Sequence, residues 1–92
     1  MIRSFKDAAT HELFLEGKHR RFTSIASVAL RKLDQMQAAL SVDDLKEPPG
    51  NRLEMLKGDR AGQYSIRINR QFRVCFVWKA DGAYDVEITD YH

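Results

Sequence analysis

The sequence contains a single cysteine and no long apolar run. Because Cys75 has no second cysteine to pair with, an internal disulfide is excluded, which suits a reducing compartment. No segment is long and apolar enough to span a membrane, and the N-terminus lacks the apolar core of a signal peptide. We therefore expect a cytoplasmic protein without membrane contact. No base stands near Cys75 in the sequence, so we interpret it as a small strand residue rather than a nucleophile.

The motifs of several common enzyme classes are also missing. The histidines are scattered without metal-ligand spacing, at His11, His19 and His92. No serine lies in a G-x-S-x-G elbow, and no glycine pattern matches a Walker loop or a dinucleotide-binding turn. The sequence therefore predicts no metal and no cofactor, and it disfavours a serine hydrolase.

Charge is present in quantity but is unevenly distributed. The net charge is only +2, yet residues 52–79 contain seven basic and two acidic side chains. The first 51 residues are nearly neutral, and residues 81–92 contain acidic side chains without lysine or arginine. A chain of 92 residues is expected to form one domain, over residues 1–92, with a modest core. A basic central segment on a near-neutral body is typical of nucleic-acid binding.

Helices are predicted before strands, which indicates an α+β fold with two N-terminal helices on a small twisted antiparallel sheet. Residues 1–5 are expected to form an edge strand. Asp7 is expected to cap a helix over residues 8–16 that stops at Gly17. A second helix is expected over residues 24–39. Its apolar residues recur at helical spacing and form a core stripe, Ile25, Ala29, Leu33, Met36 and Leu40.

The first predicted hairpin places two arginines opposite each other. Strands at 64–68 and 72–78 keep their apolar residues on one face only if a three-residue loop pairs Ile68 with Phe72. Arg67 then lies opposite Arg73 on the other face. Like charges directly opposite are destabilising, so we interpret the pair as the holder of an anion, for which phosphate is the usual candidate. Two solvated arginines on an open face are the alternative.

A second predicted hairpin brings the C-terminus to the same face. Keeping Trp78 and Val86 on the core side requires a loop of odd length around residues 80–83. That register places Thr89 or Tyr91 level with Arg73. The expected result is a sheet face that carries both arginines and Tyr91 beside Asp90 and His92.

Such a face suits metal-free RNA cleavage, in which a 2′-hydroxyl attacks the adjacent phosphorus. Arginines can stabilise the phosphate but cannot exchange protons at neutral pH. The base and the acid must therefore come from a set of five residues, Tyr91, His92, Asp90, Glu54 and Lys57. The remaining basic residues of the central segment, Arg60 and Arg70, are candidates for RNA or phosphate binding, together with Lys57.

Motifs along essentially the whole chain resemble the HigB toxins of the RelE/ParE superfamily. They are the run Pro49-Gly50-Asn51-Arg52-Leu53-Glu54, the turn Leu56-Lys57-Gly58-Asp59-Arg60, the two strands of the first hairpin, and the closing Asp90-Tyr91-His92. The resemblance implies ribosome-dependent cleavage of mRNA in the A site, without metal, leaving 2′,3′-cyclic phosphate ends. It also implies a helix-turn-helix antitoxin similar to HigA, and contact with operator DNA only through the inactive toxin–antitoxin complex.

The resemblance also implies residue roles. Lys57, Arg67 and Arg73 would hold phosphate, Tyr91 or His92 would transfer a proton, and Asp90 would orient its neighbours.

One position departs from the family pattern, because well-studied relatives have a histidine where this chain has Glu54. Glu54 is either a general base or a strand glutamate that balances Arg52 or Lys57. Two other functions stay open as well. One is a non-catalytic ParE-like toxin that acts on DNA gyrase, and the other is a non-enzymatic module that binds nucleic acid.

Overall fold

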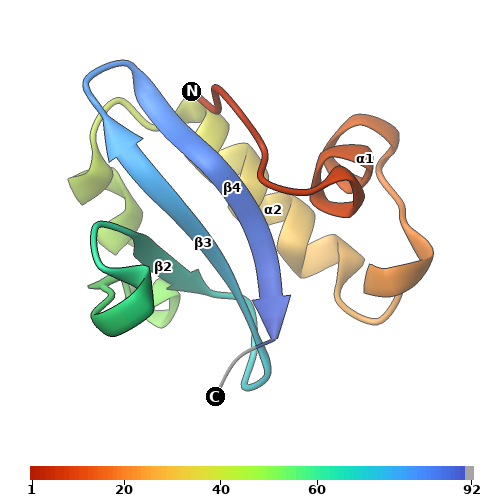
Figure 1. The fold of residues 1–92 in the computed structure, drawn as a ribbon. Helices are drawn as coiled ribbons and strands as arrows, with labels where there is room; N and C mark the ends of the chain where they lie inside the picture. The colour runs from red at the N-terminus through yellow and green to blue at the C-terminus, as the bar shows by residue number, and fades with distance from the viewer. Residues whose placement is uncertain (91–92) are drawn as a thin grey trace.

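The protein has two layers, with helices on one face of a four-stranded antiparallel sheet (Figure 1). The computed structural model describes residues 1–90. The helices are α1 (Ala8–Glu16) and α2 (Ala26–Ala38), and α2 passes behind β4 in Figure 1. The strands follow in the order β1-β2-β3-β4, with bounds Glu54–Met55, Tyr64–Arg67, Phe72–Lys79 and Gly82–Asp90. The predicted α+β class is confirmed. Within residues 1–90, no helix is long and apolar enough to cross a bilayer.

Short 3-10 turns connect these elements. They are η1 (Arg20–Phe22), η2 (Val42–Lys46), η3 (Pro49–Asn51) and η4 (Gly58–Arg60).

Helix α1 has the predicted bounds because both of its caps are encoded locally. The Asp7 carboxylate accepts a hydrogen bond from the Thr10 N–H at 3.1 Å and satisfies one free donor of the first turn. Gly17 takes a left-handed conformation with φ 78° and donates its N–H to the Leu13 carbonyl, which closes the last turn.

Helix α2 is shorter than predicted, and its apolar stripe ends earlier. Ile25, Ala29, Leu33 and Met36 are buried as expected. Leu40 is 93 % exposed, so its assignment to the core stripe is wrong. The backbone turns extended at Ala39, with ψ 138°, and this takes Leu40 out of helical phase.

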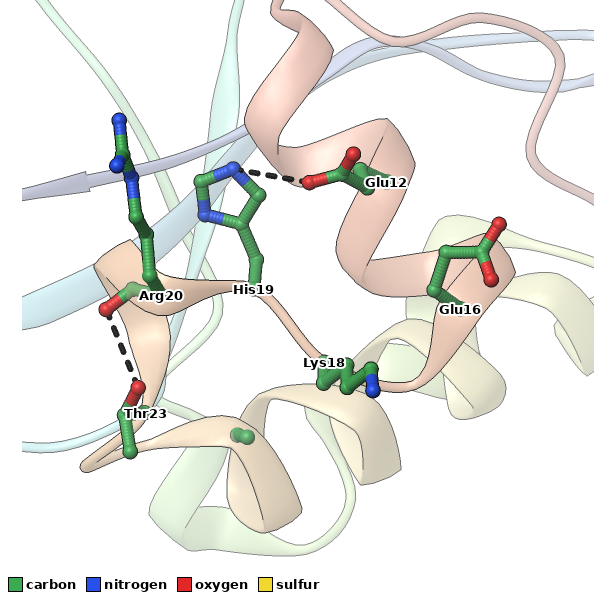
Figure 2. Close-up of a pocket in the computed structure, with 7 residues that line it drawn as sticks. Glu12, Glu16, Lys18, His19, Arg20 and Thr23 are labelled. Atoms are coloured by element: carbon green, nitrogen blue, oxygen red, sulfur yellow. Dashed lines mark hydrogen bonds and ion pairs between the residues drawn. The ribbon is translucent and has the colours of Figure 1, made fainter.

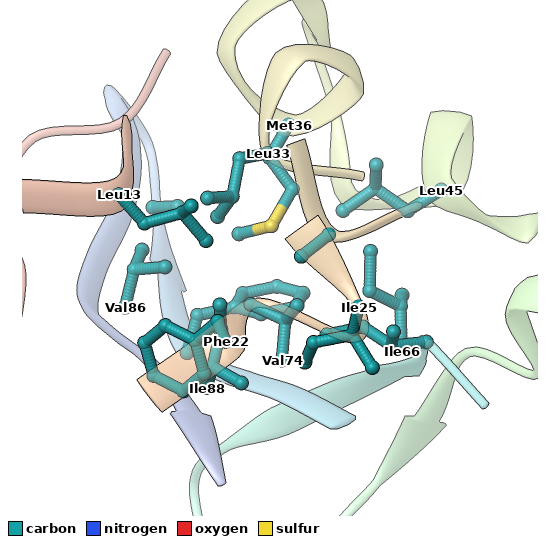
Figure 3. Packing of buried hydrophobic residues seen from close by; sticks show 14 of the residues in the cluster. Leu13, Phe22, Ile25, Leu33, Met36, Leu45, Ile66, Val74, Val86 and Ile88 are labelled. Carbon is teal, nitrogen blue, oxygen red and sulfur yellow. The ribbon is translucent and has the colours of Figure 1, made fainter. Parts of the chain in front are cut away.

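The core lies between the helices and the covered face of the sheet (Figure 3). Its fully buried members come from every layer and include Leu13, Phe22, Leu33, Met36, Leu45, Ile66, Val74, Phe76 and Val86. On β3, Val74 and Phe76 lie two residues apart and so face the helices together, which leaves the other face of the sheet for polar groups.

The N-terminal segment lies along the outer edge of β4. It makes isolated parallel bridges, Ile2 with Ala83 and Phe5 with Val86, rather than the continuous edge strand that was expected. The approach is close at Gly82, where a Cβ atom would lie 2.0 Å from the Met1 carbonyl oxygen. Gly82 is therefore required for this edge to be covered.

The first hairpin has the predicted register. Ile68 donates its N–H to the Phe72 carbonyl at 3.0 Å across the three-residue turn, and Arg67 pairs with Arg73. The side chain of Asn69 shapes this turn, since its Oδ1 accepts hydrogen bonds from the N–H groups of Gln71 and Phe72 at 2.8 and 2.7 Å.

The second hairpin differs from the prediction in its turn. Lys79 pairs with Gly82, so the loop has two residues instead of an odd number. A β-bulge restores the register further along, because Asp85 and Val86 together face Phe76, and Asp85 takes φ 53°. Val86 therefore returns to the core, Ala83 rather than Tyr84 is buried, and Thr89 pairs with Arg73 as one of the two predicted alternatives.

The difference between Leu33 and Leu40 gives a test of the packing. Leu33→Ala removes a fully buried side chain, and we expect it to lower the free energy of unfolding by about 2–5 kcal/mol. The same substitution at the exposed Leu40 is expected to change it by less than about 0.5 kcal/mol. Urea titrations followed by circular dichroism measure both values. Equal losses at the two positions would contradict the end of α2 described above.

Candidate functional site

Four arginines line one pocket at the end of the sheet where β1 meets the β2–β3 turn. The pocket has a volume of about 460 Å³ and is lined by Arg52, Glu54, Arg67, Asn69, Arg70 and Arg73. Glu54 is the single acidic residue in this lining, so the pocket carries a clear excess of positive charge. A concave site of one sign concentrates ligands of the opposite sign, so the charge of this pocket favours an anion.

Arg73 is held in place before any ligand binds. Its Nε donates to the Ser65 hydroxyl at 2.9 Å, and its Nη2 donates to the Arg52 carbonyl at 3.1 Å. The same Nη2 lies 3.1 Å from the Glu54 carboxylate, and the Arg73 side chain is only 17 % exposed. A guanidinium fixed in this way needs little reorganisation when negative charge develops beside it.

Arg67 has a different partner from Arg73, although the two residues pair across the strands. Its Nε donates to the Asn69 carbonyl at 3.1 Å, which draws the guanidinium toward the turn. Separate acceptors offset the repulsion that two like charges would otherwise cause. The predicted arginine pair is therefore confirmed as a pair, and both of its members line the pocket.

Glu54 pairs with Arg73, which is neither of the two cations that the sequence suggested as partners. The antiparallel register explains the choice, because Glu54 lies opposite Ser65 on β2 and Ser65 lies opposite Cys75, two residues after Arg73. The Glu54 side chain is 55 % exposed and lies at the pocket wall. An anion bound at the Arg73 guanidinium would therefore lie close to the negative charge of this carboxylate.

The other predicted site residues are distributed around the pocket or away from it. Arg70 lines the pocket from the turn, whereas Lys57 is exposed before η4 and does not line it. Arg60 donates to Glu87 at 2.8 Å and to Gln63 at 3.0 Å on the polar face of the sheet, also outside the lining.

Asp90 connects the end of β4 to the turn that carries Arg70. It accepts a hydrogen bond from the Gln71 side chain at 2.8 Å. Tyr91 and His92 lie outside the described residues, so their roles in proton transfer stay predictions.

Sequence reasoning missed two members of the pocket, Arg52 and Asn69. Arg52 reaches it through a left-handed backbone with φ 48°, directly after η3. No periodicity predicts that conformation for an arginine. Asn69 had a recognisable signal, since asparagine at the start of a tight turn often caps the backbone that follows.

A second, larger pocket lies between α1 and the start of α2 (Figure 2). It has a volume of about 790 Å³ and contains His19, whose Nε2 lies 3.1 Å from the Glu12 carboxylate. The other ring nitrogen accepts the Arg21 N–H at 3.1 Å, so both nitrogens are engaged in structural contacts. None of the predicted site residues lines this pocket.

Cys75 lies on the polar face of the sheet beneath charged side chains and is fully buried. Burial raises its pKa to about 11, although Arg60 and Arg73 act in the opposite direction. The interpretation of Cys75 as an unreactive strand residue is consistent with both observations.

Solved structures with the same arrangement of elements belong to YoeB-type toxins. YoeB from Staphylococcus aureus, in a complex with YefM, superimposes with a TM-score of 0.62 at 17 % identity, over 100 % of this chain and 98 % of that one. A YoeB/ParE toxin from Agrobacterium tumefaciens gives a TM-score of 0.56 at 17 % identity, over 98 % and 99 % of the two chains. At these identities the likeness establishes the fold alone, which this chain shares with these small toxins.

Sequence comparison identifies the family within this class. Residues 3–92 match the model of the RelE-like toxin of type II toxin-antitoxin system HigB. The chain is 40 % identical to Toxin HigB-1 of Vibrio cholerae over 80 residues, which cover 85 % of this chain and 84 % of that protein. It is 30 % identical to Endoribonuclease HigB of Proteus vulgaris over 98 aligned positions that cover both chains completely. The protein belongs to the HigB toxin family of type II toxin–antitoxin systems.

The raised pKa of Cys75 predicts slow alkylation in the folded state. With a pKa of about 11, the thiolate fraction at pH 8 is roughly 100-fold smaller than in the unfolded chain. We expect iodoacetamide to label the native protein at least that much more slowly than the urea-unfolded protein, as mass spectrometry would show. The neutral thiol also contributes stability below its ordinary pKa, and this contribution is lost as the pH rises toward 11. Rapid labelling of protein that is folded by circular dichroism would contradict the burial.

Proposed function

We propose that this toxin is an endoribonuclease that cleaves mRNA in the ribosomal A site and so stops translation. The observation that carries the proposal is the arginine pocket, in which Arg73 is already fixed by three acceptors. Its family consists of toxins of type II systems, and the Proteus vulgaris relative is named an endoribonuclease. A toxin that only bound a protein target would not need four arginines around one pocket. A phosphate that passes through a pentavalent transition state gains negative charge, which arginines stabilise.

The proposed reaction is an internal transfer within the RNA strand. The 2′-oxygen forms a bond to the adjacent phosphorus, the bond from phosphorus to the 5′-oxygen breaks, and the products are a 2′,3′-cyclic phosphate and a free 5′-hydroxyl. Arg73 and Arg67 stabilise the charge on the non-bridging oxygens. One proton leaves the 2′-hydroxyl and one reaches the 5′-oxygen, so the reaction consumes neither water nor metal.

Proton transfer is assigned to groups that can titrate, because the arginines stay charged at neutral pH. We propose Tyr91 or His92 as the main proton-transfer group, with Asp90 orienting its neighbours and Lys57 as a further candidate. The Gln71–Asp90 hydrogen bond supports this placement, since it ties the end of β4 to the turn that forms one wall of the pocket.

The proposed partners follow from the family. We propose a HigA-like antitoxin with a helix-turn-helix domain, the ribosome with its mRNA, and operator DNA bound only through the antitoxin. Among the structural relatives, the YoeB toxin of Staphylococcus aureus was solved together with YefM. The proposed compartment is the cytoplasm, where ribosomes and mRNA meet.

A reconstituted translation reaction with a defined mRNA tests the proposed activity. We expect the wild type to make cuts within A-site codons, mapped by primer extension, and only when ribosomes are present. Arg73→Ala is expected to lower the cleavage rate by roughly 100- to 1,000-fold, because it removes a fixed donor to the developing charge. Tyr91→Ala is expected to lower it as well.

Lys79→Ala serves as the matched control, because Lys79 is an exposed cation at the opposite end of β3 and should leave the rate unchanged. Intact mRNA with folded wild-type protein would contradict the proposal. A DNA-damage response in cells with intact mRNA would instead indicate gyrase as the target, and salt-dependent RNA binding without cleavage would indicate a binding module.

Glu54→Gln separates the two roles that are open for Glu54. The substitution removes the carboxylate that occupies Arg73 and raises the pocket's net charge by one. We expect the affinity for a 2′-O-methyl oligonucleotide, which cannot be cleaved, to rise by roughly fivefold at low salt. If Glu54 balances charge, cleavage of ordinary mRNA is retained. If Glu54 is the general base, cleavage falls even though binding becomes tighter. Unchanged binding would contradict the Glu54–Arg73 pair.

A further inference from the structure

Asn51 is a completely buried polar residue next to the arginine pocket, and the proposed reaction leaves it without a role. Its side chain is 0 % exposed. The Nδ2 group lies within hydrogen-bond distance of three acceptors, Gln35 Oε1 at 3.0 Å, the Leu45 carbonyl at 3.1 Å and the Glu47 carbonyl at 3.2 Å. Its Oδ1 accepts a short hydrogen bond from the Lys32 ammonium. A fully satisfied buried amide of this kind holds its surroundings in one arrangement.

The partners of Asn51 come from three separate segments. Lys32 and Gln35 lie on α2, Leu45 lies in η2, and Glu47 precedes the proline turn. Gln35 also donates to the Glu47 carbonyl, so α2 and the connecting loop are joined twice. The loop that leads into β1 is therefore anchored to a core helix through the Asn51 side chain.

This anchor matters because of the residue that follows. Arg52 has φ 48° and ψ 55°, a left-handed conformation that costs roughly 1–2 kcal/mol for a residue with a side chain. Such a conformation persists when the residues on both sides determine it. On one side is Asn51, and on the other is β1, where Glu54 pairs with Ser65.

The left-handed conformation of Arg52 determines the positions of two of the three groups that accept from Arg73. The Arg52 carbonyl accepts from the Arg73 Nη2, and Glu54, two residues later, pairs with the same nitrogen. We propose that Asn51 is a positioning residue for the pocket, which fixes the Arg52 carbonyl and Glu54 and through them the Arg73 guanidinium. Its effect on catalysis rests on the proposed function, whereas its effect on Arg73 does not.

The test compares Asn51→Ala with a control that destabilises the fold elsewhere. Leu13→Ala is that control, because Leu13 is fully buried on α1, which is not among the elements that form the pocket. Both variants are studied at a temperature where thermal unfolding shows each to be folded. The first readout is the solvent-exchange rate of the Arg73 Nη2–H, the group that donates to the Arg52 carbonyl and lies against Glu54, in ¹⁵N NMR spectra, assigned by the loss of its signal in Arg73→Lys. The second readout is kcat and KM for ribosome-dependent cleavage.

We expect Asn51→Ala to accelerate exchange at the Arg73 Nη2–H by roughly tenfold, which corresponds to the loss of about one hydrogen bond. We expect kcat to fall by roughly 100-fold, the effect of a displaced reacting group. Leu13→Ala should change neither by more than about twofold. Equal effects in both variants would assign Asn51 a purely structural role and overturn the proposal, as would wild-type exchange in Asn51→Ala.

Lys32→Met keeps the proposal testable if Asn51→Ala does not fold. It removes only the donor to the Asn51 Oδ1 and leaves the three Nδ2 contacts, so a smaller acceleration of the Arg73 exchange is expected. Exchange at the wild-type rate in Lys32→Met would then overturn the proposal. The two hypotheses also fail in different ways. Faster exchange without any cleavage by the wild type would refute the proposed function alone, whereas cleavage with unchanged exchange would refute the positioning role alone.

Discussion

The Arg73 guanidinium is the group on which the geometry of the site depends. It starts on β3, meets a hydroxyl on β2, and reaches a carbonyl and a carboxylate at β1. Strand β1 has only two residues and pairs with β2 alone, so backbone hydrogen bonds by themselves hold it weakly. One cation therefore both attaches the edge strand and lines the arginine pocket. A ligand that binds the Arg73 guanidinium would therefore compete with the contacts that hold β1 against the sheet.

This arrangement is possible because the two faces of the sheet carry different kinds of side chain. The helices cover one face with apolar residues, which supplies most of the stability. The other face buries small groups, Ser65 and Cys75, under charged side chains that include Arg60 and Arg73. Small residues leave room for the arginine stems to pack above them, and the side chains of Arg60 and Arg73 are accordingly only 29 % and 17 % exposed. The stability of the core thus permits a cluster of like charges that would destabilise a freely exposed sheet.

The features that could be predicted from the sequence are those set by local chemistry or by strand alternation. The caps of α1 act within four residues, and the register of the first hairpin follows from its apolar residues. Alternation reports only which face a side chain occupies. A two-residue turn followed by a bulge at Asp85 gives the same faces beyond the bulge as a loop of odd length. The turn was therefore wrongly predicted, while Thr89, one of the two residues predicted to lie level with Arg73, does pair with it. Arg52 could not be found in this way, because strand alternation does not predict a left-handed backbone for an arginine that follows a 3-10 turn.

The site consists of two halves with different physical requirements. Charge stabilisation needs rigid donors, and the sheet provides them through Arg73, which is held between buried neighbours. Proton transfer needs a group that can titrate and approach the reacting oxygens, and the candidates Tyr91 and His92 directly follow β4. The Gln71–Asp90 hydrogen bond joins these halves, since Gln71 belongs to the turn whose other residues, Asn69 and Arg70, line the pocket. The sheet thus supplies the fixed cations, and the residues proposed to transfer protons belong to the segment that follows β4 in the sequence. Glu54, at a position where the resemblance implies a histidine, places a negative charge 3.1 Å from the Arg73 Nη2, so its effect falls on the charge-stabilising half of the site.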